Sequence, residues 1–453
     1  MSTSRHEMIQ VPGVDRRTFL RLSGAVGVAT AAGGLAGVLA ARTAPAYAQG
    51  TKLHLLQWAD FIPEGDLELR RQLAEYGRQT RTEVTLETIN LNDLQPRITA
   101  AIQSGAGADI IVMAWNWPHL YQAALADMSD LCEWKAEDQG GFYLQCEAAA
   151  RVGRRWLALP YGILAGLIAY RKSWFAEVGV TEPPTKLDDY RKIGTALKKT
   201  GRPVGQTLGH TLGDATGWTY PLLWAFGGAE TDRTGKKVVL RGRGTVESVK
   251  WMVAFWKEAC DEGGLAWDDT NNNRAFHAGE ISATLNGASI YIFAKRNPDK
   301  IRDEKGQPMF TDIGHFPIPD GPQPTPVLGL PLSHAVMKYS KHQKAAKEFL
   351  RWLHSKEQYG KWFEVETGYN VGAANYWAQH PMWERIDETL KPFKAGARAS
   401  RMFGYAGPSN AKASEAWSKY IITDMYAKAV QGTPAEQAVA WAESELKKIY
   451  EGA

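Results

Sequence analysis

Two tryptophans flank an asparagine directly after an apolar run in the segment DIIVMAWNWPHLY, residues 109–121. The run is typical of a buried strand, so Trp115, Asn116 and Trp117 fall in the loop where that strand ends. Loops lie at the surface, where a soluble chain seldom leaves two indoles in water without a use for them. Indole faces suit the apolar C–H patches of sugar rings, and an amide can bond ring hydroxyls. The pattern predicts a carbohydrate-binding rim; the alternative is that the indoles cover core beneath the loop.

The elements around this rim alternate in type. Strands are predicted over residues 52–59, 83–89 and 109–114, and helices over residues 63–80 and 92–105, the second with an Asn92/Gln95 capping pair. Strand, helix, strand, helix, strand with short connections indicates a parallel sheet covered by helices, in which ligands bind beyond the carboxyl ends of the strands. Trp58 and Asp60 stand at the end of the first strand, so the sequence predicts that they share one rim with the residues after the third.

Four further segments carry a family resemblance. They are LALPYG with the following GLIAYRKSWFAEVGVTEPPTKLDDY, then RAFHAGEISATLNGASIY, SKHQKAAKEFLRWLHSKEQYGKWFEVETGY and YAKAVQGTPAEQAVAWAESELKKIY. Each is degenerate alone, but their order along nearly the whole chain after residue 48 resembles the family 1 extracellular solute-binding proteins, the maltose-binding-like receptors of ABC importers.

The resemblance implies an α/β periplasmic-binding-protein fold with two lobes, parallel-type sheets and several chain crossings between them. One lobe would take residues 49–160 and 330–380, and the other residues 161–329 and 381–453. Pro160 and Gly162 interrupt the run at the first crossing, and the Pro/Gly-rich residues 317–332 fit the second. The implied function is to bind a carbohydrate or sugar alcohol between the lobes by closure and to deliver it to a permease.

The second lobe would add its own rim residues. Tyr161 follows the first crossing, and Asp214 and Trp218 stand in a Gly-punctuated stretch before a helix, where Asp214 alternatively caps that helix. By the resemblance, Asn286 and Gly287 bring backbone close to the ligand. The remaining candidates in the later part of the chain are Tyr291 and Trp417. Ser289 and Met113 stand where close relatives would show aromatic residues, so specificity for malto-oligosaccharides is not implied.

The first 48 residues predict export. Arg16 and Arg17 precede an uncharged stretch, residues 22–41, and the small residues Ala46 and Ala48 follow it. The pattern resembles a twin-arginine signal, although Asp15 stands where Ser or Thr is usual. Cleavage before Gln49 would leave the protein in the periplasm; the alternative is a single membrane anchor.

Charge and motifs narrow the function classes. Residues 1–48 hold five arginines and two acidic residues, so their removal lowers the formal charge from +4 to +1 and implies no nucleic-acid partner. A monomer without cofactor or metal is expected, and no protease, redox, hydrolase or nucleotide motif indicates an enzyme, which stays as a rival. Other rivals keep the fold but bind a polyamine or a phosphorylated polyol. Cys132 and Cys146 either close a disulfide or, with Cys260, remain thiols.

Overall fold

Residues 50–398 and 400–452 are described by the computed structural model, so the predicted export signal of residues 1–48 lies outside the described part. Residues 52–453 form a single compact unit. Within the described residues, no helix has both the length and the apolar character needed to cross a bilayer.

The first sheet has five strands in the order β2-β1-β3-β10-β6. Its strands are β1 Lys52–Trp58, β2 Glu83–Ile89, β3 Ile110–Ala114, β6 Leu159–Leu164 and β10 Leu330–Val336. β1 pairs in parallel with both β2 and β3, whereas β10 runs antiparallel to β3 and β6. β3 and β10 are buried along their whole length. β3 is accordingly apolar throughout, whereas β10 also buries Ser333 and His334.

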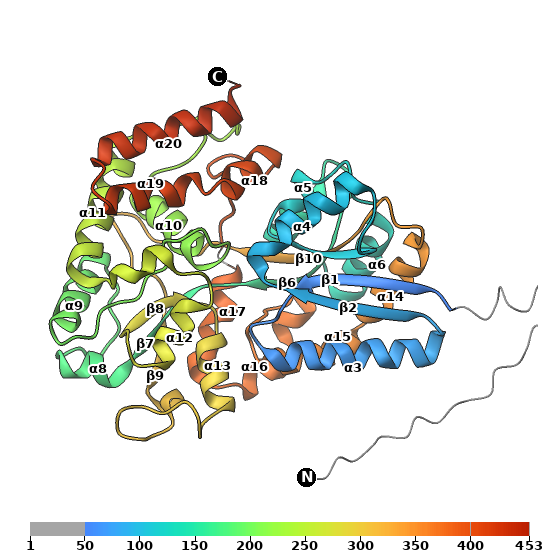
Figure 1. Ribbon diagram of the computed structural model, residues 1–453, viewed down its shortest axis with the longest axis horizontal. Coiled ribbons are helices and arrows are strands. Elements are labelled where there is room, and N and C mark those ends of the chain that lie inside the picture. Colours follow the sequence, from blue (N-terminus) through green and yellow to red (C-terminus); the bar gives the residue numbers. More distant parts are fainter. Residues whose placement is uncertain (1–49, 399, 453) are drawn as a thin grey trace, which may run out of the picture. The chain divides into compact units, whose positions relative to one another are not determined.

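Helices cover both faces of this sheet (Figure 1). They are α3 Pro63–Thr80, α4 Leu91–Ser104, α5 Trp117–Leu120, α6 Ser129–Gln139, α7 Leu144–Ala150, α14 Gln343–Leu353 and α15 Lys356–Glu366. α3 and α15 pack together on one face, and α4 lies on the other (Figure 1). A two-stranded ribbon follows α7, formed by β4 Arg151–Val152 and β5 Arg155–Trp156.

The second sheet has three strands in the order β8-β7-β9. Its strands are β7 Leu167–Arg171, β8 Ala283–Asn286 and β9 Ile313–Phe316. β7 is antiparallel to both neighbours, so the prediction of a parallel-type sheet was wrong for this half of the molecule. The reason is that β7 continues directly from the first sheet and enters between β8 and β9, which run in a common direction. Similarly, β10 returns from the second sheet and enters the first in reverse.

The remaining helical elements surround the second sheet or form the C-terminal layers, with two exceptions. The α-helices are α8 Lys172–Glu177, α9 Leu187–Lys199, α10 Asp214–Ala225, α11 Arg243–Ala259, α12 Asn271–His277, α13 Ser289–Arg296, α16 Met382–Arg385, α17 Lys391–Arg398, α18 Ala411–Ser418, α19 Ile421–Val430 and α20 Ala435–Tyr450. Short 3-10 turns are η1 Glu262–Ala266, η2 Met309–Asp312, η3 Asn375–Gln379 and η4 Glu388–Leu390. The exceptions are η3 and α16, which pack against α6 and α15 of the first half. α11 packs against α9, α19 and α20, which closes the side of this half away from the first sheet (Figure 1).

The chain passes from the first sheet to the second at Ala165 and Gly166, between β6 and β7. β6 therefore stays in the first sheet through Leu164, beyond the crossing predicted at residues 160–162. Pro160 does not interrupt β6, because the ladder with β10 absorbs it at a bulge between Leu332 and Ser333.

Local signals set most helix ends in the first half. Pro63 occupies the first turn of α3, where its missing N–H costs nothing, and Arg81 ends the helix in the left-handed conformation. The predicted Asn92/Gln95 capping pair was wrong, because the helix begins earlier: the Asn90 side chain accepts from the Asn92 backbone N–H at 2.9 Å. Gly105 ends α4 with a φ of 65°, as a C-terminal glycine commonly does.

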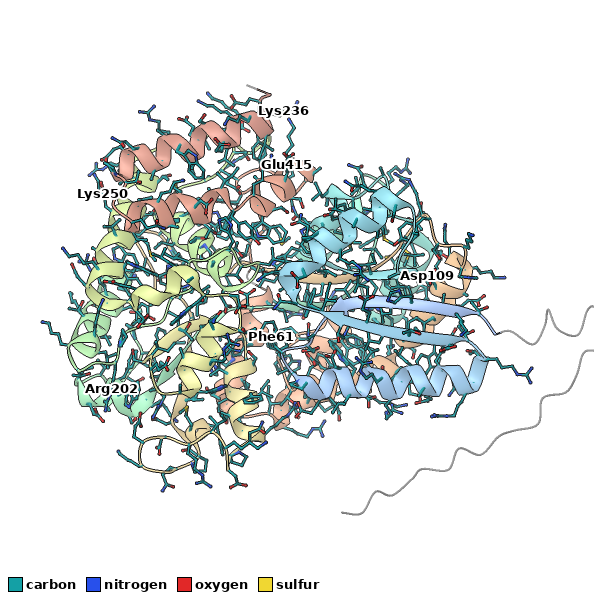
Figure 2. The ribbon with its side chains drawn as sticks, in the orientation of Figure 1. Phe61, Asp109, Arg202, Lys236, Lys250 and Glu415 are labelled. Carbon is teal, nitrogen blue, oxygen red and sulfur yellow. The ribbon has the colours of Figure 1, made fainter. Side chains whose placement is uncertain are left out.

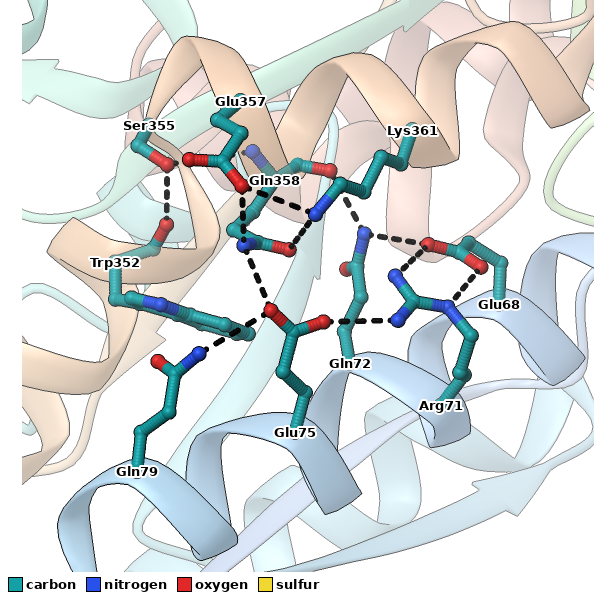
Figure 3. Close-up of polar contacts among 10 residues, drawn as sticks. All are labelled: Glu68, Arg71, Gln72, Glu75, Gln79, Trp352, Ser355, Glu357, Gln358 and Lys361. Carbon is teal, nitrogen blue, oxygen red and sulfur yellow. Dashed lines mark hydrogen bonds and ion pairs between the residues drawn. The ribbon is translucent and has the colours of Figure 1, made fainter.

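A polar network holds α3 against α15 (Figure 3). The Gln72 amide donates to the Gln358 carbonyl oxygen at 2.7 Å, and the Gln358 amide reaches Glu75 at 3.3 Å. Arg71 bridges Glu68 and Glu75 on α3 at 2.7 and 2.8 Å. Because Gln72 is buried, its bond to the backbone of α15 satisfies a group that would otherwise be costly to exclude from water. The network fixes the position of α15 and hence of the loop that follows it.

In the second half, Glu230 is a buried carboxyl that joins distant segments. Its side chain accepts from the Gly404 backbone N–H at 2.6 Å and from the Tyr220 hydroxyl at 3.4 Å. Burial raises the pKa of Glu230 to about 7, so the group is protonated in the folded protein at a pH where it is ionised in the unfolded chain.

This pKa predicts how stability changes with pH. The stabilisation from a carboxyl with a raised folded pKa is present in acid and is lost as the pH rises through that pKa. Glu230→Gln keeps an acceptor for Gly404 but removes the titration. Relative to the natural protein, the variant should therefore gain unfolding free energy between about pH 4.5 and 7, by at most about 3 kcal/mol. Urea unfolding at pH 5 and pH 8 measures this gain. Glu415→Gln, at a surface pair with Lys419, is the control; an equal difference at both pH values contradicts the prediction.

Candidate functional site

A cavity of about 680 Å³, counting the space open to solvent, lies where the two sheets meet. The first sheet contributes the ends of its parallel strands, with Trp58 as the last residue of β1, Phe61 in the loop after β1 and Trp115 after β3. Elements of the second sheet supply Asp214 at the start of α10 and Asn286 at the end of β8. The other lining residues are Leu91, Leu164, Ala165, Gly166, Gly213, Gly217, Asp269, Leu285, Gly287, Ser289, Val327, Leu328, Leu330 and Tyr369. The cavity thus lies beyond the carboxyl ends of β1 and β3, as expected for a parallel sheet.

Aromatic rings form one wall of the cavity. The ring centroids of Trp58 and Trp115 are 6.5 Å apart, and those of Phe61 and Tyr369 are 6.3 Å apart. Phe61 projects from the loop between β1 and α3 at the junction with the α12 and α13 segment (Figure 2). Tyr369 follows α15, which ends at Glu366 and packs against α3. This packing brings the Tyr369 ring into the lining of the cavity. The wall offers flat apolar surfaces spaced for stacking.

Trp115 is held in an unusual conformation. Its φ of 49° lies in the left-handed region, which is rare for a bulky residue, and its indole N–H is buried without a hydrogen-bond partner among the described residues. The ring packs on Trp417 at 5.0 Å, which in turn stacks on Phe403 at 4.9 Å. Backbone strain of this kind persists where surrounding structure enforces it, commonly at binding sites.

Polar side chains form the opposite wall. One Asp214 oxygen, Oδ2, accepts from the amides of Asn272 at 2.7 Å and Asn286 at 3.3 Å. The Asn286 carbonyl oxygen accepts from the Ser289 hydroxyl at 2.9 Å. Asp269 accepts from the backbone N–H groups of Gly213 and Asp214, which orders the start of α10. The result is a fixed array of carboxylate and amide groups at the second-sheet side of the cavity.

The two carboxyls influence each other. Burial, followed by repulsion from Asp269, raises the pKa of Asp214 well above its ordinary value. Burial also raises the pKa of Asp269, although backbone N–H donors act in the opposite direction. Both groups therefore favour either the protonated form or a cation placed beside them.

Gly287 controls the approach of Tyr369. A Cβ added at Gly287 would lie 2.8 Å from the Cε2 of the Tyr369 ring, which is closer than real Cβ contacts. The glycine therefore allows the Tyr369 ring to lie against the end of β8.

Five of the residues predicted for the site line this cavity: Trp58, Trp115, Asp214, Asn286 and Gly287. Asp60 lines a neighbouring cavity that shares Phe61, Leu91 and Asp269 with the first one. Burial raises the pKa of Asp60 to about 7, and burial together with repulsion from Asp60 raises the pKa of Glu366. Asp60 thus belongs to a buried acid pair beside the cavity.

Tyr161 lines a separate cavity of about 480 Å³ between the first sheet and its helices α3, α14 and α15. Its ring stacks on His334 at 4.5 Å. His334 in turn contacts His354, which bonds the buried ammonium group of Lys135 at 2.9 Å. Burial lowers the pKa of Lys135 to about 7, and no carboxyl is among its hydrogen-bond partners. Tyr161 is therefore placed in the first half, apart from the lining of the main cavity.

The structure corrects the placement of two residues that follow Trp115. The Asn116 amide is buried and donates to the Ser409 hydroxyl at 3.0 Å, so it joins the loop after β3 to a C-terminal segment. Trp117 begins α5 and is fully buried between Trp115, at 6.2 Å, and Trp417, at 5.7 Å. Both side chains support the lining from behind and do not form it.

Three more distant candidates are likewise buried in packing away from the lining. Trp218 is 1% exposed, lies at 5.6 Å from Phe255 and donates to the Met252 sulfur at 3.3 Å. The Tyr291 hydroxyl donates to Asp387 at 2.8 Å. Trp417 is fully buried behind Trp115. Trp218 points to the core because its ring packs against Phe255 and Met252 of α11.

Sequence reasoning missed Phe61, Asp269 and Tyr369. Phe61 follows the predicted Asp60 directly, so the same strand-end signal covers it. Asp269 stands in the run WDDTNNN, which mixes acids and amides ahead of a helix, a signal for a polar loop. Tyr369 has no local signal, because it is brought to the cavity by the packing of α15 on α3.

Among the described residues there is neither a metal site nor an exposed thiol. No group of three or more His, Cys, Asp or Glu side chains among them has the geometry of a metal site. Cys132, Cys146 and Cys260 are all buried free thiols, so Cys132 and Cys146 do not form the disulfide left open above. Burial raises the pKa of each thiol, which keeps all three unreactive.

Comparison with known proteins places the chain. A model of the family described as bacterial extracellular solute-binding protein matches residues 72–388. The chain belongs to this family. This agrees with the sequence-based resemblance, but the twin-arginine signal is not addressed by the match.

Individual relatives share the fold at low identity. The diacetylchitobiose-binding protein DasA of Streptomyces coelicolor is 25% identical over 292 residues, which cover 61% of this chain and 63% of that relative. The match therefore spans less than two thirds of DasA. Maltose-bound MalE3 of T. maritima has a TM-score of 0.74 at 18% identity, covering 88% of this chain and 99% of its own. The GacH receptor of Streptomyces glaucescens, studied with acarbose, has a TM-score of 0.75 at 17% identity, covering 89% and 99%.

The buried position of the Trp218 ring predicts that removing it lowers the stability of the protein. Trp218→Ala removes a large side chain from a packed aromatic cluster, so the free energy of unfolding should fall by about 3–5 kcal/mol. Urea unfolding followed by circular dichroism measures the loss. Trp441→Ala, on α20 beside Lys428, is the matched control because Trp441 is only partly buried. Equal stability of the natural protein and Trp218→Ala would show that the ring is not part of the core.

Proposed function

We propose that the protein is the binding receptor of an ABC importer and takes a carbohydrate or sugar alcohol into the cavity between the sheets. The observation that carries this proposal is the make-up of the lining: aromatic faces from the first sheet lie opposite carboxylate and amide groups from the second. Sugar rings have apolar faces and hydroxylated edges, so they need both kinds of wall at once. The family supports the receptor role, and relatives named for diacetylchitobiose, maltose and acarbose support the ligand class.

The two halves would act as lobes that close on the ligand. We assign residues 49–164 and 330–380 to one lobe and residues 165–329 and 381–453 to the other, which moves the predicted boundary from residue 160 to the end of β6. Trp115 belongs to the first lobe and Asp214 to the second, so a ligand that contacts both favours the closed form. Arg296 of α13 already joins the lobes, since it donates to Glu64 of α3 at 2.6 Å. A permease would then recognise the closed form.

The cavity does not favour a phosphorylated ligand. A phosphate group is normally bound by Arg, Lys or a cluster of backbone N–H donors. No Arg, Lys or His lies among the residues that line the cavity, and the N–H groups of Gly213 and Asp214 at the start of α10 already bond Asp269. A phosphorylated polyol would therefore meet carboxylates where it needs cations.

We propose a receptor and not an enzyme. The family and the relatives are binding proteins, and the thiols among the described residues are buried away from the cavity. Asp214 and Asp269 are the acids in the lining, and Asp269 is committed to the start of α10. Chromatography of a bound sugar after long incubation distinguishes the two classes, since a receptor releases its ligand unchanged.

The proposal also covers how the protein is exported and where it acts. Residues 1–48 would direct export through the twin-arginine machinery and be removed near Ala48 and Gln49, leaving a monomer in the periplasm. Mass measurement of the protein secreted by its host tests the cleavage position.

Trp115→Ala should weaken binding of a carbohydrate by about tenfold or more, because it removes both a stacking face and the indole N–H of the same ring. Calorimetry with the sugar that gives the largest thermal shift in a carbohydrate and polyol panel measures the affinity. Trp441→Ala controls for the loss of one tryptophan outside the cavity. Unchanged affinity in a folded Trp115→Ala protein contradicts the site assignment.

A further inference from the structure

Acidic side chains predominate among the charged groups around the cavity. Asp214 and Asp269 line it, and Asp60 and Asp268 line the neighbouring cavity that shares Asp269 with it. Among the residues lining these two cavities there is no Lys, Arg or His. The site therefore places carboxyls beside a partly enclosed space without a counter-charge in its lining.

The partners of Asp214 leave one oxygen free. Oδ2 accepts from Asn272 and Asn286, whereas no described residue donates a hydrogen bond to Oδ1. The start of α10 holds the two residues together, because the backbone N–H of Asp214 donates to an Asp269 oxygen at 2.7 Å. Removing two neighbouring carboxylates from water without a cation is costly, because neutral hydrogen bonds offset only part of the lost hydration.

A second feature points to a ligand at the same place. Trp115 is 1% exposed, lines the cavity and has an unpaired indole N–H among the described residues. Its ring and that of Trp58 offer electron-rich faces, which attract a cation as well as the C–H groups of a ring. The wall opposite the carboxyls thus also favours positive charge.

We propose that the ligand is a carbohydrate or polyol bearing a protonated amine, with the ammonium group at Asp214 Oδ1 and the ring or chain between Trp58, Trp115 and Tyr369. This inference rests on the proposed receptor function and narrows its ligand class. The amine supplies the counter-charge that the lining lacks. An acetylated nitrogen is neutral and therefore lacks this interaction.

Matched ligands test the proposal without any substitution. The mature protein is titrated calorimetrically at pH 6.5 with glucosamine, N-acetylglucosamine and glucose, and with the β-1,4-linked dimers of these three sugars. The amine form should bind at least about tenfold more tightly than its acetylated and hydroxyl counterparts, as expected for a charge-assisted bond to a buried carboxylate. Spermidine is the comparison ligand with amines but no sugar.

Asp214→Asn provides the second arm, because it keeps the size of the side chain and removes its charge. The variant should reduce the preference for the amine form to about threefold or less, whereas Asp424→Asn, at a surface pair with His210, should leave it unchanged. If Asp214→Asn does not fold, the ratio of the affinities of the natural protein for the amine and the neutral sugars still tests the proposal. Equal or tighter binding of the neutral sugars overturns the inference but leaves the receptor proposal intact. Binding of spermidine in the absence of any sugar binding overturns both.

Discussion

Parallel pairing of β1 with β2 and β3 is the constraint on which the site depends. Parallel neighbours end at the same edge of a sheet, so the loops that carry Trp58 and Trp115 must lie side by side. One connection from this edge to the second sheet is only two residues long, Ala165 and Gly166, between β6 and β7. A connection this short holds the polar groups of the second half opposite the aromatic loops of the first.

The hydrophobic cores differ in how they support this arrangement. The aromatic wall is supported by the packed rings of Trp115, Trp117 and Trp417, which bring the C-terminal helix α18 against the loop after β3. In the second half, Trp218, Phe255 and Trp251 form a separate aromatic core behind α10. Each wall of the cavity therefore has its own rigid backing, and large side chains near the site divide into those that line it and those that hold the lining.

Sequence patterns predicted the alternation of strands and helices in the first half well, because hydrophobic period and capping residues are local. They also predicted the residues at strand ends, such as Trp58 and Trp115. They did not predict the direction of β7, since that depends on where the chain enters the second sheet. Nor did they predict that Trp218 faces the core or that Tyr369 reaches the cavity, because helix rotation and the packing of α15 on α3 decide both. The segment resemblance supplied the family, which no single residue revealed.

The contact between Gly287 and the Tyr369 ring has a consequence for related receptors. Any larger residue at this position must displace the phenol ring from the end of β8, which changes the space available in the cavity. A substitution at this one contact can therefore alter the size of the cavity while the fold stays the same. Diversification of cargo then requires neither a new loop nor a new strand, only a change in side-chain bulk at one contact.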